Sequence, residues 1–214
     1  MGKLTKSVQL LALIPIPFIS LFGGDSIWVF EKEEEVLAEY EMSLENRYEN
    51  EFVNGVFKYN ILLTLAYMRG ESVNPTSSFT YEFKLEPDKT FAFHEDVDAK
   101  YKDTLTKTTN AHFNAHEGFK TDGYLFGDGV CHLASLINMV AQKAALDVEA
   151  PTRHDFADIP DIPREYGVSI YSNPYSKGSN AQQNLYITNN KDKPITFKFE
   201  YTGDKVKVSV IELN

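Results

Sequence analysis

The chain is poor in cysteine and in positive charge. Its 214 residues include one cysteine, Cys131, which excludes an intramolecular disulfide and a zinc site built from cysteines. Lys and Arg number 21 against 31 Asp and Glu, giving a formal net charge of −10. That balance argues against nucleic acid or anionic lipid as a partner bound through bulk charge. The glycines at 127 and 129 are not followed by the Gly-Lys-Ser/Thr of a phosphate-binding loop, and no cofactor is expected.

The composition is that of a folded protein. Hydrophobic residues make up 43% of the chain and charged residues 24%, which predicts a globular core. The 15 Phe and 12 Tyr favour a structure that contains β-sheet. The length suits one domain with some residues left over.

The left-over residues lie at the N-terminus. Lys3 and Lys6 precede an apolar run, Val8–Gly24, which is typical of an export signal. We expect residues 1–30 to be a signal peptide or membrane anchor, although no small-residue cleavage pattern follows and a buried N-terminal element is the alternative. The rest of the protein is then extracytoplasmic, membrane-anchored or secreted.

Charge and hydrophobic periodicity divide the remaining chain. Residues 31–52 are acidic and helix-prone and are expected to form a helical spacer, followed by a domain over 53–214. Apolar spacing predicts a helix over 52–70, and two strands are expected in 79–95 around a turn at Pro87-Asp88. Alternating strands are expected over 166–213. The fold class is therefore α+β, a mainly antiparallel sheet with helices packed on it.

A helix is also expected to begin at Cys131. Its apolar side carries Leu133, Leu136, Ile137, Val140 and Ala144. Cys131 falls on the other side, together with Ser135, Asn138 and Gln142. This position argues against a cysteine that serves only to fill the core.

Four segments, in order, resemble a known family. The stretch "FGDGVCHLASLINMVAQKAALDVE" is similar to the cysteine-helix element of VanW-like proteins, and "RHDFADIPDIPREYGVSI" is similar to their histidine-proline stretch. The segments "LEPDKTFAFHE" and "NLYITNNKDKPITFKFEYTGDKVKVSV" resemble two further elements, and Asn60-Ile61 fits the preceding helix. The resemblance covers about residues 55–212.

This sequence differs from the VanW-like pattern at several positions. A Gly-Gly-Gly becomes Gly127-Asp128-Gly129, a Gln after the cysteine becomes His132, an Asn becomes His94, and Gly167 replaces a late Asp. The resemblance implies a cell-envelope context and supplies no reaction.

Cys131 has two interpretations. A helix N-terminus can lower the pKa of a thiol, and flanking glycines let backbone amides approach a ligand. Cys131 would then be a nucleophile and His154 its base, the order seen in papain-like and transglutaminase-like enzymes. Asp155, Asp158 or Asp161 could orient the imidazole, and Asp155 is the one expected at the site. The alternative is that Cys131 packs a tight glycine turn and His154 bonds to a loop.

A binding groove needs fewer assumptions. Gly127, Asp128, Gly129, His132 and Arg153 are its expected lining. The pair in "HFNAH" (112–116) would share a metal only if helical, and no third ligand is evident, so no metal site is expected. We therefore expect a VanW-like envelope protein that binds or positions a cell-wall component, or interacts with an envelope protein. The alternatives are a thiol enzyme acting on an amide or ester bond, and a structural module.

Overall fold

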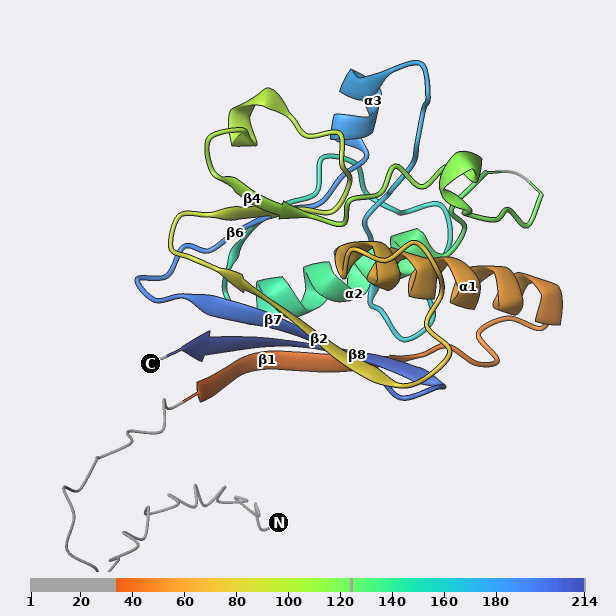
Figure 1. Cartoon of the computed structure of the whole chain (residues 1–214), viewed down its shortest axis with the longest axis horizontal. Coiled ribbons are helices and arrows are strands. Elements are labelled where there is room, and N and C mark those ends of the chain that lie inside the picture. Colours follow the sequence, from red (N-terminus) through yellow and green to blue (C-terminus); the bar gives the residue numbers. More distant parts are fainter. Residues whose placement is uncertain (1–33, 124, 214) are drawn as a thin grey trace, which may run out of the picture. The chain divides into compact units, whose positions relative to one another are not determined.

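The computed structural model describes residues 34–123 and 125–213. Within these ranges the chain forms two β-sheets with α-helices packed between and beside them, which confirms the α+β class (Figure 1). The signal or anchor expected over residues 1–30 lies outside the described residues. Among the described helices, none has both the length and the apolar character to cross a membrane.

The first sheet is antiparallel throughout and has the order β1-β8-β7-β2. Its strands are β1 (Glu34–Ser43), β8 (Lys205–Leu213), β7 (Ile195–Tyr201) and β2 (Phe79–Leu85). Alternate residues of β7, including Phe197 and Phe199, point into the core, as the period of a half-buried strand requires. The turn expected at 202–204 joins β7 to β8.

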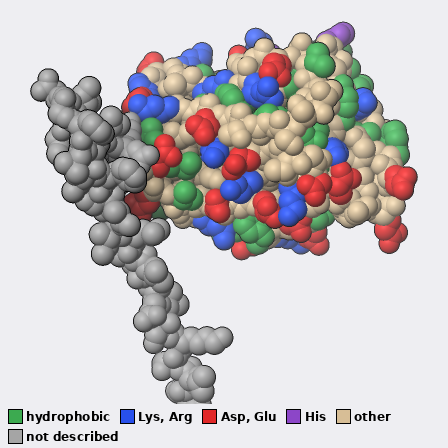
Figure 2. All heavy atoms as spheres, turned by 60° about the horizontal axis from the view of Figure 1, so that its bottom comes forward, with side chains coloured by type: hydrophobic (Ala, Val, Ile, Leu, Met, Phe, Trp, Pro, Cys, Tyr) green, Lys and Arg blue, Asp and Glu red, His purple; other side chains and the backbone are tan. Residues whose placement is uncertain are grey.

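The acidic helix expected over residues 31–52 is wrong. Residues Glu34–Ser43 form the edge strand β1, paired with β8. The register sets Glu39 and Glu41 beside Lys207 and Lys205, at 3.4 and 2.8 Å from the lysine Nζ. Figure 2 shows such acidic and basic side chains interspersed on this face. Pairing with β8 therefore outweighs the helix preference of the glutamates, which are solvated on a strand.

The second sheet has the order β4-β3-β6-β5. Its strands are β4 (Leu105–Thr108), β3 (Thr90–Ala92), β6 (Tyr186–Thr188) and β5 (Asp147–Glu149). The β3–β4 pair is parallel, and the other pairs are antiparallel. The strands expected on either side of Pro87-Asp88 both exist, but β2 and β3 belong to different sheets.

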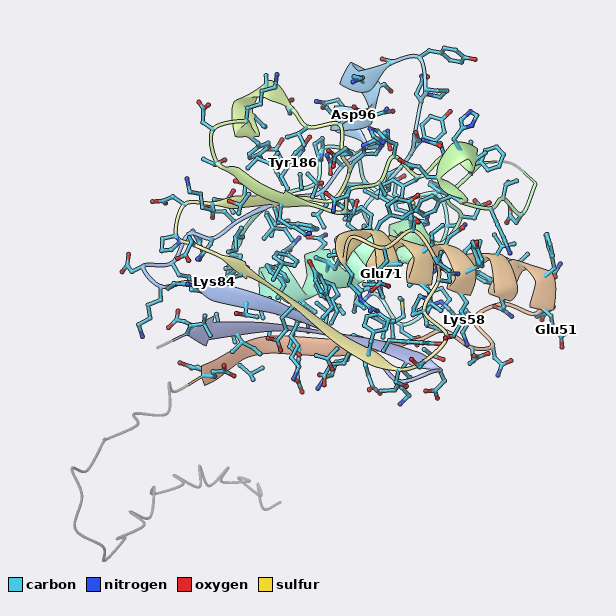
Figure 3. The ribbon with its side chains drawn as sticks, viewed as in Figure 1. Glu51, Lys58, Glu71, Lys84, Asp96 and Tyr186 are labelled. Atoms are coloured by element: carbon cyan, nitrogen blue, oxygen red, sulfur yellow. The ribbon has the colours of Figure 1, made fainter. Side chains whose placement is uncertain are left out.

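The two long helices lie between the sheets in Figure 1, and a short third helix lies at the top of that view, beyond the second sheet. They are α1 (Glu51–Met68), α2 (Val130–Lys143) and the short α3 (Lys177–Gln182). Asn50 caps α1 by accepting from the backbone N–H of Phe52, and Gly70 follows its end with φ of +81°. Figure 3 marks α1 by Glu51 and Lys58, with Asp96 and Tyr186 on the side of the second sheet. The α2 helix packs on α1, β1 and β8, which places its N-terminus beside the turn that leads into α1.

Candidate functional site

The glycine loop before α2 is shaped by close packing. Gly127 and Gly129 have φ of +87° and +95°, values that L-residues rarely adopt. A Cβ on Gly129 would lie 2.8 Å from the Cα of Phe57, and one on Gly127 would lie 3.1 Å from the Cβ of Phe113. The two glycines are therefore required by the backbone path of the loop over α1.

Asn60, fully buried on α1, fixes both ends of this loop. Its Nδ2 donates to the carbonyl of Lys120 at 3.0 Å and to that of Asp128 at 2.8 Å. Its Oδ1 accepts from the Lys120 backbone N–H at 2.9 Å. One amide side chain thus satisfies three backbone groups and sets where the loop enters and leaves.

The polar side of α2 binds a neighbouring extended segment. Asn138 donates to the carbonyl of Tyr166 at 2.8 Å, and Ser135 Oγ accepts from the N–H of Val168 at 2.9 Å. Cys131 Sγ accepts from the N–H of Ile170 at 3.3 Å and lies 3.4 Å from its carbonyl, to which the thiol donates. The contacting residues are three or four apart on α2, a rise of about 5–6 Å, and two apart on the extended segment, a rise of about 6.6 Å. These two spacings are similar, so successive side chains of α2 meet successive backbone groups of the segment.

This match corrects the strand expected at residues 166–172. The segment begins as a 3₁₀ turn, η3 (Arg164–Tyr166), and has a single isolated bridge, between Val168 and Arg153. Side chains of α2 satisfy its backbone groups on one edge, and on the other edge Gly167 and Ser169 bond to the backbone of His154 and Thr152. Cys131 is one of three residues that hold it.

The surroundings of Cys131 disfavour a thiolate. Burial raises the pKa of the Cys131 thiol to about 11, and the Ile170 N–H only partly offsets this effect. Within the described residues, no hydrogen bond joins its sulfur to His154. The low thiol pKa that a nucleophile needs is therefore not found.

His154 lies near the same place but has other neighbours. It is 6% exposed, its ring centroid lies 4.0 Å from that of Phe156 with the rings tilted by 43°, and burial lowers its pKa. Its Nδ1 is buried without a hydrogen-bond partner. Gly167 packs against its backbone so closely that a Cβ there would lie 2.4 Å from the His154 carbonyl oxygen. The glycine that departs from the family pattern is therefore required here.

Two expected site residues point elsewhere. Arg153 is exposed and donates to the carbonyl of Glu165 at 3.4 Å. Asp155 is exposed too, and its carbonyl accepts from Arg164 at 2.8 Å. Neither lines the cleft described below. His112 and His116 do not lie on one helix, which a shared metal would have required. His116 sits in a 3₁₀ turn, η2 (Ala115–Glu117), and His112 precedes that turn.

His132 belongs to a network that the sequence did not indicate. Arg47 NH2 lies 3.3 Å from His132 Nδ1, and Tyr48 Oη lies 3.2 Å from His132 Nε2. Arg47 also donates to the carbonyls of Ser43 and Pro160 and to Asp161. Burial and the Arg47 charge hold the pKa of His132 well below its usual value.

That network fixes a tautomer. A guanidinium can only donate, so His132 Nδ1 is the acceptor and the proton of the neutral ring is on Nε2. The Nε2–H then donates to Tyr48 Oη, and the hydroxyl hydrogen of Tyr48 remains available to another acceptor.

Asp122 and Asp128 form a carboxyl pair at the loop. Asp128 Oδ2 accepts from the Asp122 backbone N–H at 2.8 Å. Burial raises the pKa of Asp128 to about 6; the Asp122 N–H opposes the rise, and the Asp122 carboxylate adds to it. Within the described residues, neither carboxylate makes a salt bridge.

These elements enclose a cleft of about 340 Å³ at the N-terminus of α2. Its lining is mainly apolar, with polar groups from the loop, from α2 and from the 154–171 segment. The lining residues are Tyr48, Phe57, Asp122, Leu125, Phe126, Gly127, Asp128, Gly129, Cys131, His132, His154, Phe156, Ala157, Ser169, Ile170 and Tyr171. A cleft of this kind can hold a small ligand or one end of a larger one.

The cleft brings together most of the residues expected from the sequence. Gly127, Asp128, Gly129, Cys131, His132 and His154 all line it. Asn60, Arg47, Tyr48 and Asp122 complete or support it and were not expected as site residues. Two of them have a sequence signal: Asp122 shares a glycine-rich loop with Asp128, and Asn60 belongs to the Asn60-Ile61 pair of the resemblance.

In comparisons with known proteins, no family model, no curated protein and no solved structure matches the chain.

Proposed function

We propose that this protein is a binding module of the cell envelope that holds a cell-wall component in the α2 cleft without catalysing a reaction. The observation that supports it best is the cleft itself: apolar walls, a few convergent polar groups and a thiol engaged with backbone. The envelope setting rests on the sequence resemblance and on the basic-apolar N-terminus.

A thiol enzyme is the second candidate. Cys131 and His154 line the same cleft, which is the observation in its favour. Against it stand the raised pKa of Cys131 and the two contacts of its sulfur with Ile170. A purely structural module has less support, because the acidic segment meant to act as its spacer is a strand of the sheet.

Co-sedimentation with purified peptidoglycan tests the proposal. Phe126 and Phe156 are 49% and 75% exposed at the cleft. Replacing both with Ala removes apolar area that a ligand would bury, so we expect about tenfold weaker binding or more. Tyr175→Ala is the control, because Tyr175 is 95% exposed and lies outside the cleft lining.

A serine at position 131 separates binding from catalysis. Ser keeps a donor and an acceptor for Ile170, so Cys131→Ser should bind peptidoglycan as the wild type does. Release of soluble fragments by the wild type, and not by Cys131→Ser, would establish the enzyme instead. If the variant with both Phe126 and Phe156 replaced by Ala binds peptidoglycan as the wild type does, the cleft is not the binding site.

A further inference from the structure

The charge within the cleft is unbalanced. Asp122 and Asp128 both line it, and the described residues supply no salt bridge to either carboxylate. The nearest guanidinium, that of Arg47, is 2% exposed and engaged with Asp161 and with backbone carbonyls. The Lys120 ammonium lies 3.6 Å above the ring of Tyr59. Among the described lining residues, the cleft therefore has two acidic groups and no Lys or Arg, and Arg47 reaches it only through His132, at 3.3 Å.

The other titratable groups of the cleft do not offset this charge. His132 and His154 are neutral because burial lowers the pKa of each. Burial keeps Cys131 and Tyr48 in their protonated, uncharged forms, since it raises the pKa of each. The potential inside the cleft is then set by the two aspartates and is negative at neutral pH.

Two further polar groups of the cleft have hydrogen-bonding capacity that is not used within the described residues. His154, 6% exposed, lines the cleft and has a buried Nδ1 without a hydrogen bond. The Tyr48 hydroxyl accepts from His132 and has its own hydrogen to donate. Buried polar groups are satisfied in nearly all native proteins, so the unpaired His154 Nδ1 beside the cleft favours a ligand that supplies a hydrogen bond. The Tyr48 hydroxyl is half-buried and can donate to the same ligand.

The walls suit a cation with an apolar body. Aromatic rings of Tyr48, Phe57, Phe126, Phe156 and Tyr171 line the cleft. The faces of such rings attract a positive charge, and their area favours burial of apolar groups. The carboxylates and the aromatic faces of the cleft thus both favour a positively charged group on an apolar body.

We propose that the cleft recognises a primary ammonium group carried on a short apolar, amide-bearing body, with Asp122 and Asp128 as its charge partners. This inference rests on the proposed binding function and specifies the ligand class of the same site. An amide carbonyl next to the ammonium would accept from the Tyr48 hydroxyl.

A matched pair of probes tests it in the full chain by calorimetry. L-phenylalaninamide has the ammonium, the amide and an aromatic body, while N-acetyl-L-phenylalaninamide has a neutral acetamide in place of the ammonium. We expect the charged probe to bind about tenfold more tightly or better. Asp122→Asn and Asp128→Asn should each remove most of that preference, and Asp192→Asn, an exposed aspartate outside the cleft, should retain it.

The outcomes are separable. Asp122 donates its backbone N–H to Asp128, and Asp122→Asn keeps that bond while it removes the carboxylate that raises the pKa of Asp128. The Asp122→Asn variant therefore remains informative if Asp128→Asn is poorly folded. Equal affinity for the two probes, or a charge preference that survives Asp122→Asn, overturns ammonium recognition. Peptidoglycan binding that needs Phe126 and Phe156 but ignores both aspartates would keep the binding function and reject this ligand class.

Discussion

Cys131 should react slowly with alkylating agents. Its pKa is raised from 9.0 to about 11 by burial, so at pH 8 roughly one thiol in a thousand is a thiolate, against roughly one in ten for an ordinary cysteine. We therefore expect alkylation of the folded protein to be about a hundredfold slower than that of the unfolded chain in urea.

The assay is the rate of iodoacetamide alkylation as a function of pH, followed by mass spectrometry of the intact chain. No hydrogen bond joins Cys131 to His154 within the described residues, so His154→Ala should leave the rate within about twofold. A thiol that reacts well below pH 8.5, and loses this reactivity in His154→Ala, would refute the reasoning and restore the nucleophile.

Three further predictions concern the loop and its carboxyl pair. Asn60→Ala removes three hydrogen bonds to the backbone and should cost about 3 kcal/mol in the free energy of unfolding, at about 1 kcal/mol for each bond, measured by urea denaturation. A loss below about 1 kcal/mol would contradict the role given to Asn60. Gly129→Ala combines a left-handed φ with a Cβ 2.8 Å from Phe57 and should cost about 3 kcal/mol or more, while Gly178→Ala, which meets open space, should be nearly neutral. Because the folded-state pKa of Asp128 is raised, its protonated form stabilises the fold, and that contribution is lost as the pH rises from about 4 to about 6. The free energy of unfolding of the wild type, relative to that of Asp128→Asn, should therefore fall over that range. A constant difference between the two proteins would show that the pKa is not raised.

The elements with strong periodicity could be predicted from the sequence. The helices near 52–70 and after Gly129, and the hairpin at 202–204, follow from apolar spacing and turn residues. The strand β1 could not, because its glutamates favour a helix locally and its partner β8 lies more than 160 residues later. The extended 166–170 segment alternates like a strand, but the hydrogen-bonding groups of α2 replace a neighbouring strand.

The part of the candidate site that is continuous in sequence could be predicted, and the part that depends on the tertiary fold could not. Residues 127–132 lie together in sequence, and His154 reaches them because the 154–171 segment runs along α2. Tyr48 and Arg47 come from the turn between β1 and α1, whose position depends on the strand that the sequence did not predict. Asp155 was expected beside His154, but neighbouring residues in an irregular loop point to different sides.

The account is tested most directly by chemical-shift mapping with soluble peptidoglycan fragments that carry free amines. It predicts shifts concentrated at the amides of residues 127–132 and 169–171, with the fragments recovered intact by mass spectrometry. Shifts confined to the charged outer face of the β1-β8-β7-β2 sheet, or fragments that emerge cleaved, would contradict it.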